Sequence, residues 1–242
     1  MVILLGIIAA AANVFGGWVL SSQKDIDRLA LRFLVASGAG FMLSATLLEI
    51  IPKSLQQPIS YAPYLILLGY LFIQLAEHTI ASHFHFGEEV HEQAVLHRHV
   101  PITALAGLTL HSFFDGVLIA ASFAVASTLG YLVFVALFLH KIPEGFTASS
   151  IMRAAGYSRR ISRLASEIIG LATLLGVLSF HAYPDALAYA LPFSAGVTLY
   201  VAASDLIPEV NREEGVMTSL FVFGGVLLYF LCEQLLKTFL PA

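Results

Sequence analysis

The stretch PITALAGLTLHSFFDGVLIAASFA, residues 101–124, decides the fold of this chain. It is apolar and long enough for a helix to cross a bilayer, which takes about 20 residues. It nevertheless contains His111 and Asp115, although insertion scales assign about 2.5–3.5 kcal/mol to an aspartate at the centre of a membrane helix. A second such stretch, LGYLVFVALFLHKIPEGFTASSI at residues 129–151, contains His140 and Glu144. The two stretches together predict membrane helices whose polar side chains are required for function.

The composition agrees with a membrane protein. Of 242 residues, 58% are hydrophobic and only 12% are charged, and the mean hydropathy is +0.85. Soluble domains are about a quarter charged. The single cysteine, Cys232, excludes a disulfide framework and a cysteine-based zinc finger. We therefore expect one polytopic transmembrane domain over residues 1–242, surrounded by the lipid bilayer and binding no nucleic acid.

Further apolar stretches predict the remaining spans. The first begins at Met1 and is too long for a signal peptide, so we interpret it as a retained span. Because the backbone in lipid must satisfy its own hydrogen bonds, every span is predicted to be helical. The fold class is thus an all-α integral membrane protein with eight transmembrane helices, at about 2–20, 30–51, 62–82, 101–124, 129–151, 164–182, 186–207 and 216–239.

Lysine and arginine predict the orientation, because cytoplasmic loops carry an excess of both. The loops after the first, third, fifth and seventh spans, with their flanks, hold Lys24, Arg28, Arg32, Arg98, Arg153, Arg159, Arg160, Arg163 and Arg212. The opposite side holds only Lys53 and Lys237. We expect the protein to lie in the plasma (inner) membrane, with both termini outside the cytoplasm.

Two segments far apart in the chain resemble each other. AGFMLSATLLEIIP (39–52) aligns with AGVTLYVAASDLIP (195–208) at a shift of 156 residues, and the same shift takes Gly69 to Gly225. The aligned spans run in opposite directions, which predicts an inverted repeat of spans 1–3 and 6–8 around spans 4 and 5. Chance similarity of two apolar helices is the alternative. Inverted repeats recur in secondary transporters, which bind their substrate near the bilayer midplane.

The polar residues of the two opening stretches predict a metal site. Residues four apart lie on one face of a helix, so His111 faces the same way as Asp115, and His140 the same way as Glu144. Two imidazoles and two carboxylates suit Zn²⁺, and also Fe²⁺, Mn²⁺ or Co²⁺. For either histidine and acid alone, a structural hydrogen-bonded pair is the alternative. Pro143 is expected to bend its helix beside the cluster.

With HSFFDG (111–116) followed by HKIPEG (140–145), eight spans and a histidine-rich loop after the third, the chain resembles the ZIP (Zrt/Irt-like) family of metal-ion transporters. The resemblance implies uptake of divalent transition metals, Zn²⁺ first and also Fe²⁺, Mn²⁺ or Cd²⁺, into the cytoplasm, with no enzymatic activity and no cofactor. It also implies a binuclear site, with His111, Asp115, His140 and Glu144 as the main ligands. Ser112, Lys141 and Glu167 would flank the second metal. Together with the repeat, it suggests an elevator-type mechanism, in which spans 1, 4, 5 and 6 carry the ion against spans 2, 3, 7 and 8.

Lys141 departs from the family pattern. A protonated amine has three donors and no acceptor, so it cannot ligate a metal. We expect it to occupy the second position as a built-in cation, which leaves room for one ion.

A different function class is an intramembrane zinc-dependent hydrolase built from His111, Ser112, Asp115 and His140. The usual H-E-x-x-H string of zinc proteases is absent, and so is a P-loop. Transport of metal without an organic substrate would separate the two classes. A homodimer is one option for the assembly.

The histidine-rich loop, residues 83–100, contains His83, His85, His91, His97 and His99. Such tracts bind metals. We expect this cytoplasmic loop to capture metal or to regulate transport, with a polar linker as the alternative.

Overall fold

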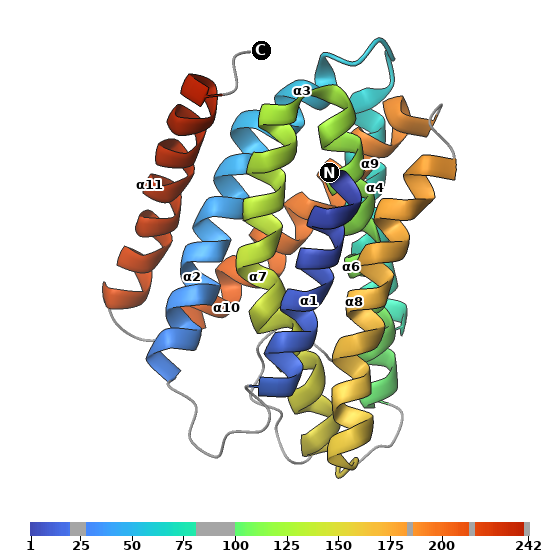
Figure 1. Cartoon of the computed structure of the whole chain (residues 1–242), viewed down its shortest axis with the longest axis vertical. Helices are drawn as coiled ribbons and strands as arrows, with labels where there is room; N and C mark the ends of the chain where they lie inside the picture. The colour runs from blue at the N-terminus through green and yellow to red at the C-terminus, as the bar shows by residue number, and fades with distance from the viewer. Residues whose placement is uncertain (20–27, 81–99, 183–185, 213–215, 240–242) are drawn as a thin grey trace.

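The computed structural model describes residues 1–19, 28–80, 100–182, 186–212 and 216–239, and it places them in an elongated bundle of helices (Figure 1). In chain order the helices are α1 Val2–Val19, α2 Arg28–Ala45, α3 Ile51–Leu55, α4 Ala62–Ile80, α6 Val100–Val125, α7 Ser127–Ala154, α8 Arg159–Ala182, α9 Leu187–Tyr200, α10 Ile207–Arg212 and α11 Val216–Phe239. The all-α prediction is confirmed for this part of the chain. The loop predicted at 83–100 lies almost wholly outside the described residues.

Each of the eight predicted segments coincides with a helix, but fewer qualify as membrane spans. Six described helices are long and apolar enough to cross a bilayer: Phe33–Leu55, Pro101–Val125, Ser127–Ala154, Arg159–Ser179, Ala188–Asn211 and Val216–Phe239. Val2–Trp18 is apolar but shorter, and α4 carries Gln74, Glu77 and His78 in its last turns. The structure therefore supports a multi-pass membrane protein, while the count of eight spans stays a prediction.

The helices pack in two groups. In the first, α1 packs on α7 and α8, and α6 packs on α7 and α8. In the second, α2 packs on α11, and α4 packs on α9. The groups meet mainly where α2 lies against α7 and where α6 lies against α9. In Figure 1, α7 lies between α2 and α1, with α11 at the far edge.

Glycines fix the crossings inside each group. A Cβ added at Gly145 of α7 would lie 1.9 Å from the carbonyl oxygen of Asn13 in α1, and one added at Gly40 of α2 would lie 2.1 Å from that of Val222 in α11. Such distances mean that the two backbones are in direct contact. At Gly38, where α2 meets α7, an added Cβ would lie 3.6 Å from Leu139 Cβ, an ordinary van der Waals distance. The contact between the groups is looser at this point.

Two helices are interrupted by wider, π-helical turns that the sequence analysis did not predict. They are Thr46–Ile50, between α2 and α3, and Val201–Leu206, between α9 and α10. Each is followed closely by a proline, Pro52 or Pro208. Proline has no N–H for the carbonyl four residues earlier, which loosens the preceding turn. By contrast, α7 runs unbroken through Pro143.

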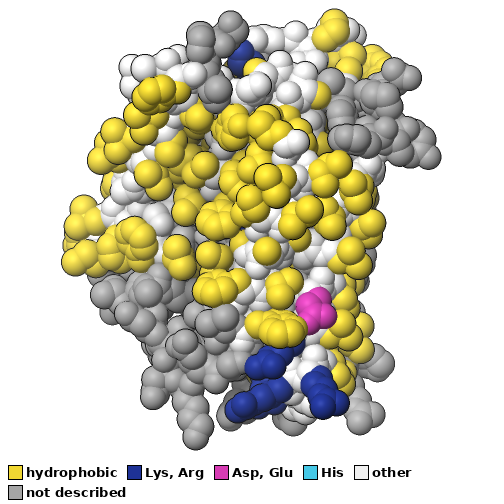
Figure 2. Space-filling model, in the orientation of Figure 1, with side chains coloured by type: hydrophobic (Ala, Val, Ile, Leu, Met, Phe, Trp, Pro, Cys, Tyr) yellow, Lys and Arg dark blue, Asp and Glu magenta, His cyan; other side chains and the backbone are white. Residues whose placement is uncertain are grey.

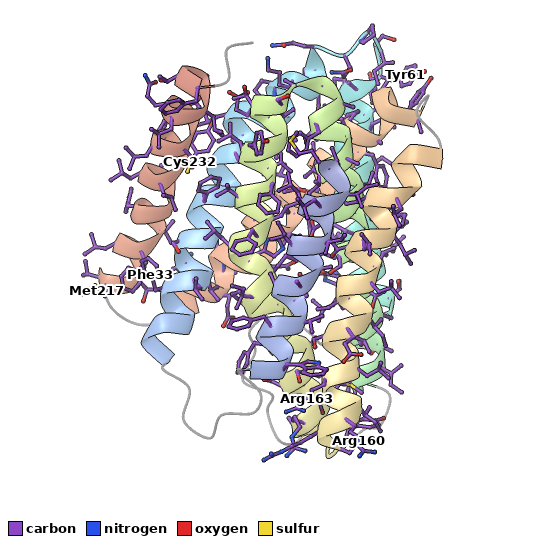
Figure 3. All side chains as sticks on the ribbon, viewed as in Figure 1. Phe33, Tyr61, Arg160, Arg163, Met217 and Cys232 are labelled. Carbon is purple, nitrogen blue, oxygen red and sulfur yellow. The ribbon has the colours of Figure 1, made fainter. Side chains whose placement is uncertain are left out.

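The surface matches a lipid environment. Large apolar side chains are exposed along the helices, many of them on α4 and α11, and Figure 2 shows them covering the middle of the molecule. Arginines gather at one end, where Figure 3 labels Arg160 and Arg163. The N-terminal end of α1 and the C-terminal end of α11 lie toward the other end (Figure 1).

Candidate metal site

The predicted polar residues meet in the interior of the first helix group. His111, Ser112 and Asp115 lie on α6, and His140, Lys141 and Glu144 lie on α7. All six side chains are buried, and the most exposed, His111, belongs to a residue that is only 4% exposed. The packing of α6 against α7 brings the two imidazoles and the two carboxylates together, while their role as metal ligands stays a prediction. The glycines next to the site residues do not lie between α6 and α7. Gly116 of α6 contacts α8, and Gly145 of α7 contacts α1.

Three ligand atoms form a nearly equilateral triangle. His111 Nε2 lies 3.1 Å from Asp115 Oδ2 and 3.4 Å from His140 Nε2, and His140 Nε2 lies 3.4 Å from Asp115 Oδ2. In a tetrahedral zinc site with bonds of about 2.0–2.1 Å, neighbouring ligand atoms are about 3.4 Å apart. The triangle therefore has the dimensions of one face of such a site.

Glu144 completes the set. Its Oε2 lies 3.9 Å from His140 Nε2, and one ligand atom from each of the four residues can be chosen so that all lie within 4.8 Å of one another. Two imidazole nitrogens and two carboxylate oxygens are a donor set that Zn²⁺ and related divalent ions accept.

Lys141 is held inside the same cluster. Its Nζ lies 2.6 Å from Asp115 Oδ2 in an ion pair, donates to Glu144 Oε2 at 2.7 Å and donates to Ser112 Oγ at 3.1 Å. The Ser112 hydroxyl in turn donates to Glu144 Oε1 at 2.5 Å. The ammonium thus lies against both carboxylates, while its place as a built-in cation at a second metal position stays a prediction.

Glu167, which was expected to flank a second metal, is placed elsewhere. Its Oε1 accepts a 2.9 Å hydrogen bond from Trp18 Nε1 at the edge of the bundle, and the Arg163 guanidinium lies 5.2 Å from the centre of the Trp18 ring. Glu167 is not one of the four clustered ligands. Its role toward a second metal stays a prediction.

Asn13 is a site residue that the sequence analysis missed. It lies on α1 and is fully buried. The side-chain amide faces two acceptors on α7, the Lys141 carbonyl oxygen at 2.6 Å and Glu144 Oε2 at 3.3 Å, and we therefore assign its nitrogen to this side, where it donates to both. A lone amide within the apolar stretch 2–20 was the available signal.

The outer sides of the two imidazoles are bare. Within the described residues, neither His111 Nδ1 nor His140 Nδ1 has a hydrogen-bond partner. No described side chain or carbonyl group therefore fixes either ring through this nitrogen.

Comparison with known proteins identifies the family. The family model described as ZIP zinc transporter matches residues 87–233, more than half of the chain and including all of the α6–α7 cluster. The chain belongs to the ZIP zinc transporter family. A family of transporters does not favour the hydrolase alternative.

Individual ZIP relatives resemble part of the chain. Zinc transporter ZIP9 of Micropogonias undulatus is 34% identical over 158 residues, which cover 60% of this chain and 50% of the relative. Zinc transporter zipt-7.2 of Caenorhabditis elegans is 34% identical over 151 residues, covering 54% and 33%. Zinc transporter ZIP13 of Danio rerio is 29% identical over 127 residues, covering 48% and 36%. The alignments thus cover half of these relatives or less.

Proposed function

We propose that this ZIP family protein carries divalent transition-metal ions, Zn²⁺ foremost and also Fe²⁺, Mn²⁺ or Cd²⁺, into the cytoplasm through the α6–α7 cluster. The observation that carries the proposal is the triangle of His111 Nε2, His140 Nε2 and Asp115 Oδ2, with edges of 3.1–3.4 Å. It is buried among membrane helices, where such groups are expensive unless they have a partner or a task. The names of the relatives, all zinc transporters, agree with this substrate.

The cluster holds one ion at a time. In the empty site one ammonium faces two carboxylates, which leaves a single net negative charge when both histidines are neutral. A divalent ion turns this into a single net positive charge, and a second ion would add two more with no further anion among the clustered ligands. Lys141 therefore neutralises the empty carrier in part and opposes double occupancy.

Movement of the first helix group against the second would expose the site to each side in turn. The glycine crossings at Gly145 and Gly40 support two groups that move as units, and the looser contact at Gly38 supports a surface between them that can slide. The site residues all lie in the first group, on α6 and α7, close to the surface that α2 covers. This is the elevator-type mechanism that the sequence suggested.

Matching contacts support the proposed inverted repeat. A Cβ added at Gly40 would lie 2.1 Å from the Val222 carbonyl, and its counterpart Gly196 would meet the Ile66 carbonyl at 1.9 Å. Both partners are related by the same shift of 156 residues. The pair Gly69 with Phe193 and Gly225 with Ser37 is related in the same way, each at 2.0 Å. The π-helical turns Thr46–Ile50 and Val201–Leu206 also overlap after this shift.

The distribution of charge supports the proposed orientation. Arg160, which Figure 3 labels at one end of the bundle, is exposed, and so are Arg159 next to it at the start of α8 and Arg153 in the last turn of α7. Cytoplasmic ends of membrane proteins are enriched in such residues. We place this end in the cytoplasm and both termini outside.

Uptake by purified protein in liposomes tests the function. Radioactive zinc should accumulate with time inside vesicles that contain the wild type, without any organic substrate, and unlabelled Fe²⁺, Mn²⁺ or Cd²⁺ should compete. Vesicles with a His140→Ala and Glu144→Ala double variant serve as the matched control. Equal accumulation in the two preparations would overturn the proposal.

A further inference from the structure

We propose that Asn13 of α1 is a positioning residue for the metal site, in that it holds the Glu144 carboxylate in place when an incoming ion repels the Lys141 ammonium and weakens its hydrogen bond to Glu144. The proposal rests on the proposed function of the α6–α7 cluster. Asn13 does not lie on α6 or α7, which supply the ligands. It also lies outside the two motifs HSFFDG and HKIPEG and outside residues 87–233, which the family model matches.

Asn13 contacts both the Glu144 carboxylate and the backbone of α7 at Lys141. Its amide reaches Glu144 Oε2 at 3.3 Å and the Lys141 carbonyl oxygen at 2.6 Å. One group thereby contacts a metal-binding carboxylate and the backbone of the turn that carries Lys141. Because Asn13 is fully buried, water cannot replace these bonds easily, and unpaired buried polar groups are destabilising.

The backbone around Asn13 keeps the amide in register with the site. A Cβ added at Gly145 would lie 1.9 Å from the Asn13 carbonyl oxygen, and one added at Gly16 would lie 2.0 Å from the Ile142 carbonyl oxygen. These reciprocal contacts lock α1 to α7 on both sides of the amide. Asn13 thus moves with the site if the first helix group moves as a unit.

The charges in the cluster explain why a neutral donor is needed. In the empty site Glu144 Oε2 accepts from both Lys141, at 2.7 Å, and Asn13. A divalent ion repels the ammonium, but it has little effect on a neutral donor. Asn13 therefore remains as a donor to Oε2, while Ser112 still donates to Oε1, and Asn13 holds Oε2 beside the ion. Loss of such a supporting hydrogen bond typically lowers metal affinity about 10–100-fold.

The test measures Zn²⁺ and Co²⁺ binding by purified protein that lacks residues 83–99, with calorimetry for zinc and visible absorption for cobalt. Asn13→Leu removes the amide at similar size, and Asn13→Ala removes it without adding atoms beside Gly145. Thr173→Val is the matched control, because the buried Thr173 hydroxyl donates only to the Ile169 carbonyl of its own helix. We expect both Asn13 variants to bind zinc about tenfold more weakly and to change the cobalt spectrum, with the control unchanged.

A double-mutant comparison separates positioning from general destabilisation. In a Glu144→Ala background, which removes the acceptor of the Asn13 amide, Asn13→Ala should cause little further loss of affinity, because interacting residues are not additive. Unchanged affinity and spectrum in both Asn13 variants would overturn the proposal, and so would an equal loss in the Glu144→Ala background. If the wild type itself binds no zinc, the proposed function fails along with it. If the wild type binds and the Asn13 variants bind equally well, only the role of Asn13 is wrong.

Discussion

Replacing Lys141 by glutamate should convert a site for one ion into a site for two. The Lys141 ammonium lies 2.6 Å from Asp115 Oδ2, and a metal bound to that oxygen would lie about 2 Å from it. Ammonium and ion would then be about 4 Å apart. Two unit charges at that distance interact by about 4 kcal/mol at an effective dielectric near 20, and a divalent ion doubles the figure to about 8 kcal/mol. Lys141→Glu reverses the sign of this interaction and adds an oxygen donor.

Metal stoichiometry by elemental analysis is the assay, on protein without residues 83–99 so that loop histidines do not contribute. We expect one ion in the parent and two in Lys141→Glu. Lys141→Met is the matched control, since it removes the charge without adding a ligand, and it should bind one ion more tightly. Two ions in the parent, or one ion in a well-folded Lys141→Glu protein, would refute the reasoning.

Three further predictions concern flux and packing. His140→Ala and Glu144→Ala should each lower zinc uptake at least tenfold, because each removes a ligand together with its supporting contacts; uptake at the wild-type rate with normal expression would rule out this site. Deletion of residues 83–99 should leave measurable uptake and change its zinc dependence, since the proposed path uses only residues of α6 and α7; complete loss of uptake in a folded protein would contradict that path. Gly145→Ala should lower thermal stability by several degrees, whereas Gly38→Ala should not, because the added methyl groups would meet neighbouring atoms at 1.9 Å and 3.6 Å; equal melting temperatures would count against glycine-locked helix groups.

Sequence reasoning found the features that depend on local spacing. Lipid leaves helices as the only solution for long apolar stretches, so the segments around His111 and His140 were predicted correctly as helices. The spacing of four placed each histidine on the face of its acid. The charge of Lys141 indicated that its side chain lies beside the carboxylates.

Features that depend on which helices become neighbours were not predictable in this way. Nothing near Gly116 or Gly145 indicates that they contact α8 and α1. The contact of Asn13 with Glu144 joins positions far apart in the chain. The hydrogen bond between Glu167 and Trp18 also joins residues that are distant in the sequence. Such contacts follow from the packing of whole helices, which one-helix periodicity does not encode.

The central claim is that the transported ion is bound by imidazole and carboxylate groups between α6 and α7. X-ray absorption at the zinc edge tests it most directly, on protein without residues 83–99 loaded with one equivalent of Zn²⁺. The account predicts four nitrogen and oxygen ligands at about 2.0–2.1 Å, with the outer-shell scattering of two imidazoles, which should disappear in a His111→Ala and His140→Ala double variant. A spectrum without imidazole scattering, or imidazole scattering that persists in the double variant, would contradict it.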